Sequence, residues 1–161
     1  MLLYHGSPFS FDEPNPNRGK SYRDFGVGFY LAENDIDSIS IALKDSHDGY
    51  VYTYEVDDAK LLSTVKYLEF DSFTDECLRF IYDNRMGNTV PQYDVIIGPT
   101  AGDKVNLLFN EYRKTKPSFS DVIGTMRRDI TDTKFGFQWC FTNEYPLSFL
   151  NLVDKEHVYR D

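Results

Sequence analysis

The sequence has few of the residues that metal sites and disulfide frameworks require. Among its 161 residues are two cysteines, Cys77 and Cys140, which stand inside apolar patterns and not in a C-x-x-C arrangement. Its three histidines, His5, His47 and His157, are far apart in the sequence. Because no zinc-ligand spacing results, we expect no metal site and two reduced, buried thiols.

Basic residues are outnumbered by acidic ones, 17 against 26, which gives a net charge of -9. Proteins that bind along duplex nucleic acid need a basic face, so this class is disfavoured, although a local basic pocket stays open. No apolar run approaches the ~20 residues that cross a membrane, and the opening MLLYHGS lacks the basic region of a signal peptide. We therefore expect a cytoplasmic protein without a membrane partner.

The common nucleotide-binding loops are missing too. The glycines of GVGFYLA precede a strand pattern, whereas those of a Rossmann fingerprint open a helix, and no G-K-S/T phosphate loop occurs. There is also no internal repeat, low-complexity run or long linker. At this length we expect one domain, residues 1–161, that buries a full hydrophobic core.

The chain does contain a succession of strand patterns with fewer helix patterns between them. Strands are predicted at 2–7, 29–32, 49–56, 65–70, 93–98, 135–142 and 148–153, with a further extended piece around Leu61. Helices are predicted after a cap at Asn34 or Asp35, and at 71–84, 103–114 and 120–130. The strands do not alternate regularly with the helices, which favours an α+β fold with largely antiparallel sheets.

The first candidate functional stretch is His5-Gly6-Ser7, at the end of the first strand. Taken alone, it is better explained as a strand-end histidine before a turn. In a binding site, the imidazole and the hydroxyl would supply hydrogen bonds, while the glycine would let a planar ligand approach the backbone.

The second and third candidate stretches are strands whose neighbouring side chains face opposite ways. In GVGFYLAE, alternation sends Phe29 and Tyr30 to opposite faces, so that one enters the core and the other can face a cleft. In FGFQWCFT, alternation places Gln138 on the face of Cys140 and away from Trp139. A glutamine at this position is either a satisfied core amide or a pocket residue.

Together, LYHGS, GVGFYLAE and FQWCFTNEYPLSFLNLV resemble the ADP-ribosyltransferase superfamily, on its diphtheria-toxin and poly-ADP-ribose-polymerase branch. That branch carries a histidine–tyrosine–glutamate signature on three separated strands. The chain is still more similar to a bacterial and phage family of this superfamily, whose motifs match residues 5–7, 24–30, 93–103 and 138–141. The resemblance implies an ADP-ribosyltransferase-like fold, in which two packed, mainly antiparallel sheets form a split NAD cleft flanked by a few helices.

The resemblance also implies roles around an NAD donor, with no metal. His5 would bond the nicotinamide ribose, the backbone of Gly6 would hold the carboxamide, and Tyr30 would stack on the nicotinamide ring. A relative places a carboxamide-binding hydroxyl at the position of Ser38, and Gln138 falls on the third signature position. The other residues assigned to the donor site adjoin these motifs or are cations of the preceding loop: Ser7, Arg18, Lys20, Arg23, Gly28 and Phe29.

The chemistry of NAD accounts for these residue types. The nicotinamide ring is cationic in NAD and leaves as a neutral molecule, so cleavage produces an oxocarbenium-like ribose and needs little acid catalysis. The protein must hold the ring and stabilise positive charge at the ribose. Because the pyrophosphate is anionic and the chain acidic, local cations must compensate. Arg18, Lys20 and Arg23 stand in the right loop, although a solvated loop explains them equally well.

Gln138 departs from the glutamate of the signature. A unit charge at about 4 Å is worth roughly 4 kcal/mol at an effective dielectric constant of 20, or about three decades of rate. Asp103 is the leading substitute carboxylate, although it also suits a helix start, and Asp24 and Glu144 are further candidates. Alternatively, Gln138 only orients an acceptor, or the chain binds NAD without turnover. Arg85 either pairs with an aspartate or contacts a phosphate.

The function that the resemblance implies is transfer of ADP-ribose from NAD to a macromolecule, with release of nicotinamide. Small relatives are often toxins of toxin–antitoxin pairs or phage effectors, so a small antitoxin protein is an expected partner. The acceptor, protein or nucleic acid, is not given by the sequence. Two alternatives stay open: an NAD glycohydrolase that uses water, and a catalytically weak NAD- or nucleotide-binding module in which Gln138 replaces the usual glutamate.

Overall fold

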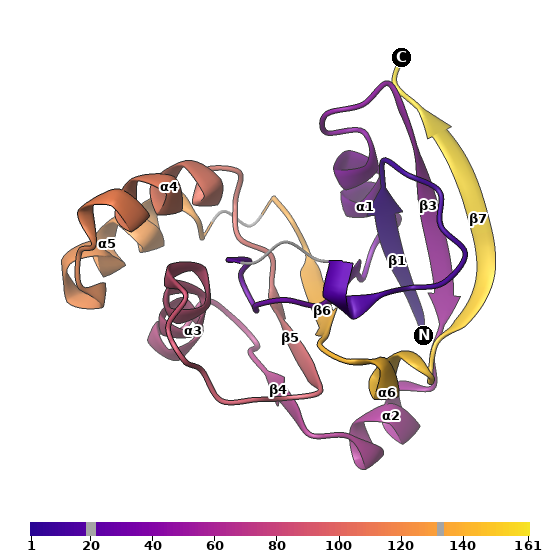
Figure 1. Ribbon diagram of the computed structural model, residues 1–161, viewed down its shortest axis with the longest axis horizontal. Helices are drawn as coiled ribbons and strands as arrows, with labels where there is room; N and C mark the ends of the chain where they lie inside the picture. The colour runs from indigo at the N-terminus through magenta and orange to yellow at the C-terminus, as the bar shows by residue number, and fades with distance from the viewer. Residues whose placement is uncertain (19–21, 132–133) are drawn as a thin grey trace.

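The structure of the protein is a computed structural model, which describes residues 1–18, 22–131 and 134–161. Within these ranges, seven strands form one mixed sheet in the order β4-β5-β6-β2-β1-β3-β7 (Figure 1). The strands are β1 (Leu2–Ser7), β2 (Phe29–Ala32), β3 (Asp48–Glu55), β4 (Tyr67–Glu69), β5 (Val95–Pro99), β6 (Phe137–Phe141) and β7 (Asn151–Tyr159). β4 and β5 pair in parallel, and the other neighbouring strands are antiparallel.

Helices lie against the two halves of this sheet (Figure 1). On one half, α3 (Asp75–Met86), α4 (Val105–Thr115) and α5 (Phe119–Asp129) pack together beside β4, β5 and β6. On the other half, α1 (Asp35–Ala42) lies against β1 and β3. The shorter elements are α2 (Asp58–Thr64), α6 (Glu144–Leu147) and the 3-10 turn η1 (Pro16–Arg18). None of the helices in the described ranges is long and apolar enough to span a bilayer.

The α+β class with largely antiparallel pairing is confirmed, but the expected pair of packed sheets is not found. β6 pairs with β2 on one side and with β5 on the other, so the described strands form one continuous hydrogen-bonded sheet. The continuity is weakest between β1 and β2, which are paired only through Tyr4 and Ala32 in the described part of the chain. In contrast, β1 pairs with β3 along its whole length, from Leu2 to Ser7.

Side-chain caps explain where the helices begin. Asn34 Oδ1 accepts a hydrogen bond from the Asp37 N–H at 2.8 Å, which confirms the predicted start of α1. Thr74 Oγ1 accepts from the Cys77 N–H at 3.2 Å, so α3 begins after Thr74. The sequence-based prediction of a start at Asp71 is therefore too early.

Two expectations about the regular elements are wrong. The segment around Leu61, expected to be extended, is helix α2, because Asp57 Oδ1 caps it by accepting from the Lys60 N–H at 3.1 Å. The last strand runs to Tyr159, well beyond the predicted 148–153. It is an edge strand with mostly exposed side chains, so it lacks the apolar pattern by which buried strands are recognised.

The central strands place their alternating side chains in two separate cores. Tyr30 and Cys140 belong to the core shared with α3, α4 and α5, whereas Phe29, Trp139 and Phe141 belong to the core on the opposite face. The predicted alternation is therefore confirmed for both β2 and β6. The two cysteines are free and buried, as predicted. Gln138, two residues before Cys140 on β6, thus faces the same side as Tyr30.

Candidate functional site

The three candidate stretches meet at the centre of the sheet, where β1, β2 and β6 are consecutive strands. His5 on β1 donates from Nδ1 to the carbonyl oxygen of Tyr30 on β2, at 2.6 Å. In the register of β2 and β6, Tyr30 lies opposite Cys140, and Ala32 lies opposite Gln138. The structure thus brings His5, Tyr30 and Gln138 onto neighbouring strands, although they are far apart in the sequence.

His5 lies among aromatic rings on one face of the sheet. Its ring stacks on Phe29 with the ring centres 4.1 Å apart, and it meets the edge of Phe11 at 5.6 Å. Removal of water by these neighbours lowers the pKa of His5 from 6.5 to about 4, so the imidazole is neutral at pH 7. With Nδ1 protonated and donating to a carbonyl, Nε2 is a hydrogen-bond acceptor.

Tyr30 is buried on the other face, with 8% of its surface exposed. Its hydroxyl donates to the Gly26 carbonyl at 2.6 Å and accepts from the Phe25 N–H at 3.0 Å. Gly26 has a φ of 86°, which a glycine adopts without strain, so the loop can fold back onto the hydroxyl. The guanidinium carbon of Arg23 lies 4.4 Å from the centre of the Tyr30 ring, as a planar cation over an aromatic face.

Gln138 belongs to a buried polar network that joins the loop before β2 to β6 and α3. Its Nε2 donates to Asp24 Oδ2 at 3.1 Å, and Asp24 Oδ1 accepts from Arg85 Nε at 2.6 Å. Arg85 also donates from Nη1 to Asn106 Oδ1 on α4, at 2.8 Å. Asp24, Arg85 and Gln138 are each less than a tenth exposed. The pairing of Arg85 with an aspartate, one of the two possibilities considered, is thereby confirmed.

The small residues of the motifs are explained by close packing. A Cβ on Gly6 would overlap the carbonyl oxygen of Ser38, so α1 rests directly on the backbone of β1. A Cβ on Gly28 would overlap the sulfur of Cys140. Ser7 forms a local turn, in which its Oγ donates to the Phe9 carbonyl at 2.8 Å. These contacts explain the presence of the two glycines and the serine, and no bound ligand is needed to explain them.

Ser38 has an unsatisfied hydroxyl. The residue is fully buried, and its Oγ has no hydrogen-bond partner among the described residues. Most buried polar side-chain atoms in proteins have a partner, so this hydroxyl is an exception. The carboxamide-binding role that the resemblance implies for Ser38 stays a prediction.

The remaining predicted cations and carboxylates that the structure describes lie on the surface. Arg18 is exposed in η1, and Lys20 lies outside the described residues. Asp103 is exposed and lies 3.6 Å from Lys134 Nζ, and no described contact joins it to His5, Tyr30 or Gln138. Glu144 is exposed at the start of α6. Among the substitute carboxylates that the sequence offers, Asp24 is the one in contact with Gln138.

Sequence reasoning misses two residues of this neighbourhood, Phe11 and Asn106. Phe11 stacks on Tyr52 with the ring centres 4.1 Å apart and makes a T-shaped contact with His5. An aromatic residue in a proline-rich loop is a weak hint of such docking. Asn106 is one polar residue of an amphipathic helix, and nothing in the sequence indicates that it contacts Arg85.

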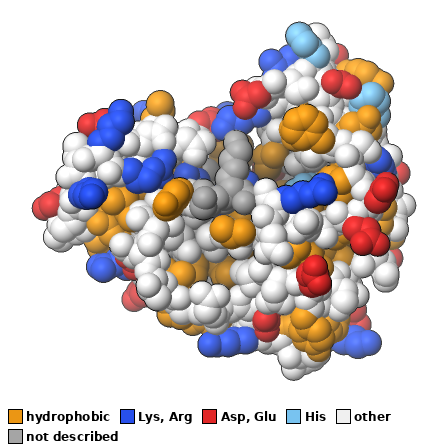
Figure 2. All heavy atoms as spheres, viewed as in Figure 1, with side chains coloured by type: hydrophobic (Ala, Val, Ile, Leu, Met, Phe, Trp, Pro, Cys, Tyr) orange, Lys and Arg blue, Asp and Glu red, His pale blue; other side chains and the backbone are white. Residues whose placement is uncertain are grey.

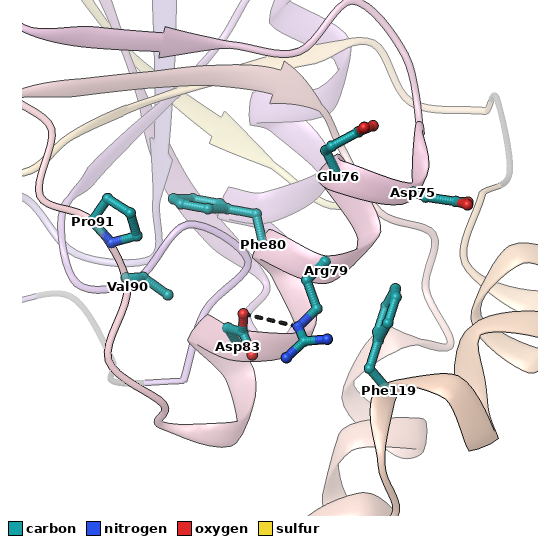
Figure 3. A pocket seen from close by; sticks show the side chains of 8 residues that line it. All are labelled: Asp75, Glu76, Arg79, Phe80, Asp83, Val90, Pro91 and Phe119. Atoms are coloured by element: carbon teal, nitrogen blue, oxygen red, sulfur yellow. Dashed lines mark hydrogen bonds and ion pairs between the residues drawn. The ribbon is translucent and has the colours of Figure 1, made fainter.

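Open hollows are found away from this site. One hollow of about 390 Å³ lies between α3, the segment after it and α5, where Phe80, Val90 and Pro91 form an apolar floor (Figure 3). The Arg79–Asp83 ion pair, with N and O 3.1 Å apart, borders it. Neither this hollow nor a smaller one beside Asp103 is lined by a residue of the three motifs.

A family model described as "Protein of unknown function (DUF3990)" matches residues 1–152. The chain belongs to the DUF3990 family. The match extends from β1 to the first residues of β7, so the DUF3990 region contains all three motif strands, the Asp24 loop and Arg85. No curated protein matches the chain.

Proposed function

We propose that this DUF3990 protein is an NAD-dependent ADP-ribosyltransferase, which transfers ADP-ribose from NAD to a macromolecular acceptor and releases nicotinamide. The observation that supports this best is the convergence of His5, Tyr30 and Gln138 on consecutive strands of one sheet. In this proposal the donor would bind at the seam between β1 and β2, which are paired only through Tyr4 and Ala32 in the described part of the chain.

The face of Tyr30 supports a donor of this kind. It already carries a planar cation, the guanidinium of Arg23, at 4.4 Å. The nicotinamide ring of NAD is also planar and cationic, so it can replace the guanidinium without loss of the cation–π attraction. Arg23, once displaced, would remain near the donor and pair with its pyrophosphate, as would Arg18. The buried hydroxyl of Ser38 would gain a partner in the carboxamide.

The motif side chains would act on the ribose. In the reaction, the bond between the ribose carbon C1′ and the nicotinamide nitrogen breaks, and its electron pair leaves with nicotinamide. A nucleophile of the acceptor bonds to C1′ and loses its proton. The His5 ring lies on the face of the sheet opposite Tyr30 and Gln138, so the proposal requires the ribose to sit at the seam between β1 and β2. There the neutral His5 would accept a hydrogen bond at Nε2 from a ribose hydroxyl and so fix the sugar. Gln138 would accept from another hydroxyl through Oε1.

The biological setting that we propose is that of a toxin controlled by a small antitoxin protein, or of a phage effector. Basic side chains gather over α4 and α5 in an otherwise acidic protein: Arg113, Lys114, Arg127 and Arg128 (Figure 2). Arg127 is paired with Asp75 and Arg128 with Asp129, so we assign the contact with an anionic part of an acceptor to Arg113 and Lys114.

A second candidate function is NAD binding without rapid turnover. It is favoured by one observation, the neutral amide of Gln138 in place of a carboxylate. Labelled NAD distinguishes the candidates when free nicotinamide and label on protein and nucleic acid are followed together. Nicotinamide release with macromolecular label supports transfer, release without label supports the glycohydrolase, and tight binding without release supports the binding module.

Two variants connect this assay to the site. Tyr30→Leu removes the aromatic face and should abolish NAD binding, whereas Tyr30→Phe keeps the ring and should retain it. Because the residue is buried, both variants must first show a cooperative thermal transition. Equal NAD binding by the folded Leu variant and the wild type would remove Tyr30 from the proposed site.

A further inference from the structure

Asp24 is a buried carboxylate held by two side chains from different parts of the fold. Gln138 of β6 donates to its Oδ2 at 3.1 Å, and Arg85 of α3 donates to its Oδ1 at 2.6 Å. Asp24 itself comes from the loop before β2, next to Arg23, which covers Tyr30. One short segment of the loop therefore contacts both the second and the third motif residues.

The contact with Asp24 fixes which way the Gln138 amide points. A carboxylate offers only acceptors, so the amide must present Nε2 to Asp24 and not Oε1. Gln138 Oε1 is then directed away from Asp24 and is available as an acceptor. Without the Asp24 carboxylate, the Gln138 amide could turn either Oε1 or Nε2 towards the ribose. With Nε2 in that place, it would offer a donor where an acceptor is needed.

We propose that Asp24 is a positioning residue of the NAD site: it holds Gln138 so that Oε1 faces the ribose of the donor, while Arg85 balances the Asp24 charge. This inference rests on the proposed function. The carboxylate of the site is therefore that of Asp24 in the loop before β2, which is hydrogen-bonded to residue 138 on β6.

The charges around Asp24 favour this arrangement. Arg85 reaches it from α3, and Arg23 lies on its own segment. The other titratable groups that face it are Cys77 of α3, Cys140 of β6 and Tyr30 of β2. Burial raises the pKa of each thiol to about 12 and that of Tyr30 above its usual value, so all three are neutral at pH 7.

A glutamate at position 138 would therefore meet a second carboxylate. Two carboxylates in hydrogen-bond contact cannot both ionise readily, and one of them takes up a proton near neutral pH. The variant Gln138→Glu should consequently lose activity as the pH rises. The double variant Gln138→Glu/Asp24→Asn exchanges amide and carboxylate between the two positions, and so restores one donor, one acceptor and one charge.

The test measures NAD cleavage and thermal stability for both single variants and the double variant. We expect Asp24→Asn to lower kcat by up to about 100-fold with KM changed less than about threefold, because a misplaced reacting group costs this much. We expect Gln138→Glu to melt at a lower temperature at pH 8 than at pH 5.5, relative to the wild type. The double variant should recover both kcat and the melting temperature.

Asp37→Asn is the matched control. Asp37 is equally buried and accepts hydrogen bonds from the Gly136 N–H at 3.0 Å and from Asn34 Nδ2 at 3.0 Å, but it does not contact Gln138. It should change stability without a selective loss of kcat. A double variant no better than the worse single variant would overturn the inference, and so would wild-type kcat in folded Asp24→Asn. Failure of the wild type to bind NAD would instead overturn the proposed function.

Discussion

Gln138 and Asp24, which are 114 positions apart in the chain, are joined by a hydrogen bond of 3.1 Å in the buried centre of the protein. The bond ties the loop before β2 to β6, and Arg85 extends it to α3. A polar network in this position is costly unless every member is satisfied. Each of the three side chains has a charged or amide partner, which fixes the geometry of the network, and Gln138 Oε1 is the acceptor to which the proposed donor would bond.

Arg23→Ala should affect two ligands in opposite directions. The variant uncovers the face of Tyr30, so 1-methylnicotinamide, a cation without phosphates, should bind more tightly, by roughly 2- to 30-fold if the displaced contact is worth about 0.5–2 kcal/mol. NAD should bind less tightly, because the proposed contact of Arg23 with the pyrophosphate is lost. Isothermal titration calorimetry with each ligand provides both values.

Arg79→Ala is the control for this comparison, since Arg79 also lies over an aromatic ring, Phe119, at 5.1 Å but far from the motif strands. It should leave both affinities unchanged. Parallel changes of the two affinities in Arg23→Ala would contradict the idea that Arg23 and the nicotinamide compete for one ring face.

His5 should make the protein less stable as the pH falls. Its folded-state pKa of about 4 lies below the unfolded value of 6.5, so the stabilisation is present above pH 6.5 and is lost as the pH falls towards 4. A shift of this size corresponds to about 3 kcal/mol. Urea unfolding of the wild type and His5→Gln at pH 7, 5.5 and 4 measures it, because the variant cannot titrate at this position. The variant also loses the stack on Phe29, so the two free energies of unfolding differ at every pH, but their difference should change by up to about 3 kcal/mol between pH 7 and pH 4. A difference that does not change with pH would disprove the burial of a neutral imidazole.

The parts of the fold that the sequence predicted are those with a local cause. Alternation on β2 and β6, the cap at Asn34 and the buried run in β5 depend on neighbours within a few residues. Helix α2 was missed because its seven residues show too little periodicity to be told from an extended segment. The length of β7 was missed because an exposed edge strand needs no apolar pattern.

The candidate site was expected as a set of residues but not as an arrangement. The motifs pointed to His5, Tyr30 and Gln138, and the sheet makes their strands neighbours. Asp24 and Arg85 appeared as separate candidates, since no local pattern shows that residues 24, 85 and 138 meet. The preference for Asp103 relied on its motif alone, and in the structure that residue faces Lys134 at the surface.

Gly6→Ala should destabilise the protein, because the added Cβ overlaps the Ser38 carbonyl and forces α1 away from β1. Overpacking of this kind costs about 1–3 kcal/mol. Gly124→Ala is the matched control, because no atom lies within 4 Å of its added Cβ in helix α5. The control should gain stability by about 1 kcal/mol, from helix propensity. Chemical unfolding measures both changes, and a neutral Gly6→Ala would show that α1 is free to shift.

Arg85→Leu should strongly lower the free energy of unfolding, because it leaves the Asp24 carboxylate buried without its cation. Breaking such a pair from one side costs about 3–5 kcal/mol. Arg79→Leu is the counterpart on the same helix, since its ion pair with Asp83 is partly exposed and worth about 0.5 kcal/mol. The difference between the two variants in urea unfolding isolates the effect of burial.

A second substitution separates loss of the cation from loss of packing around it. In Arg85→Leu/Asp24→Asn the carboxylate is replaced by a neutral amide of the same shape, so much of the stability lost in Arg85→Leu should return. If the double variant is as unstable as the sum of the two single ones, the contact of 2.6 Å between Arg85 Nε and Asp24 Oδ1 does not couple the two residues. The loop before β2 would then be held by packing alone, and Asp24 would have no fixed position from which to orient Gln138.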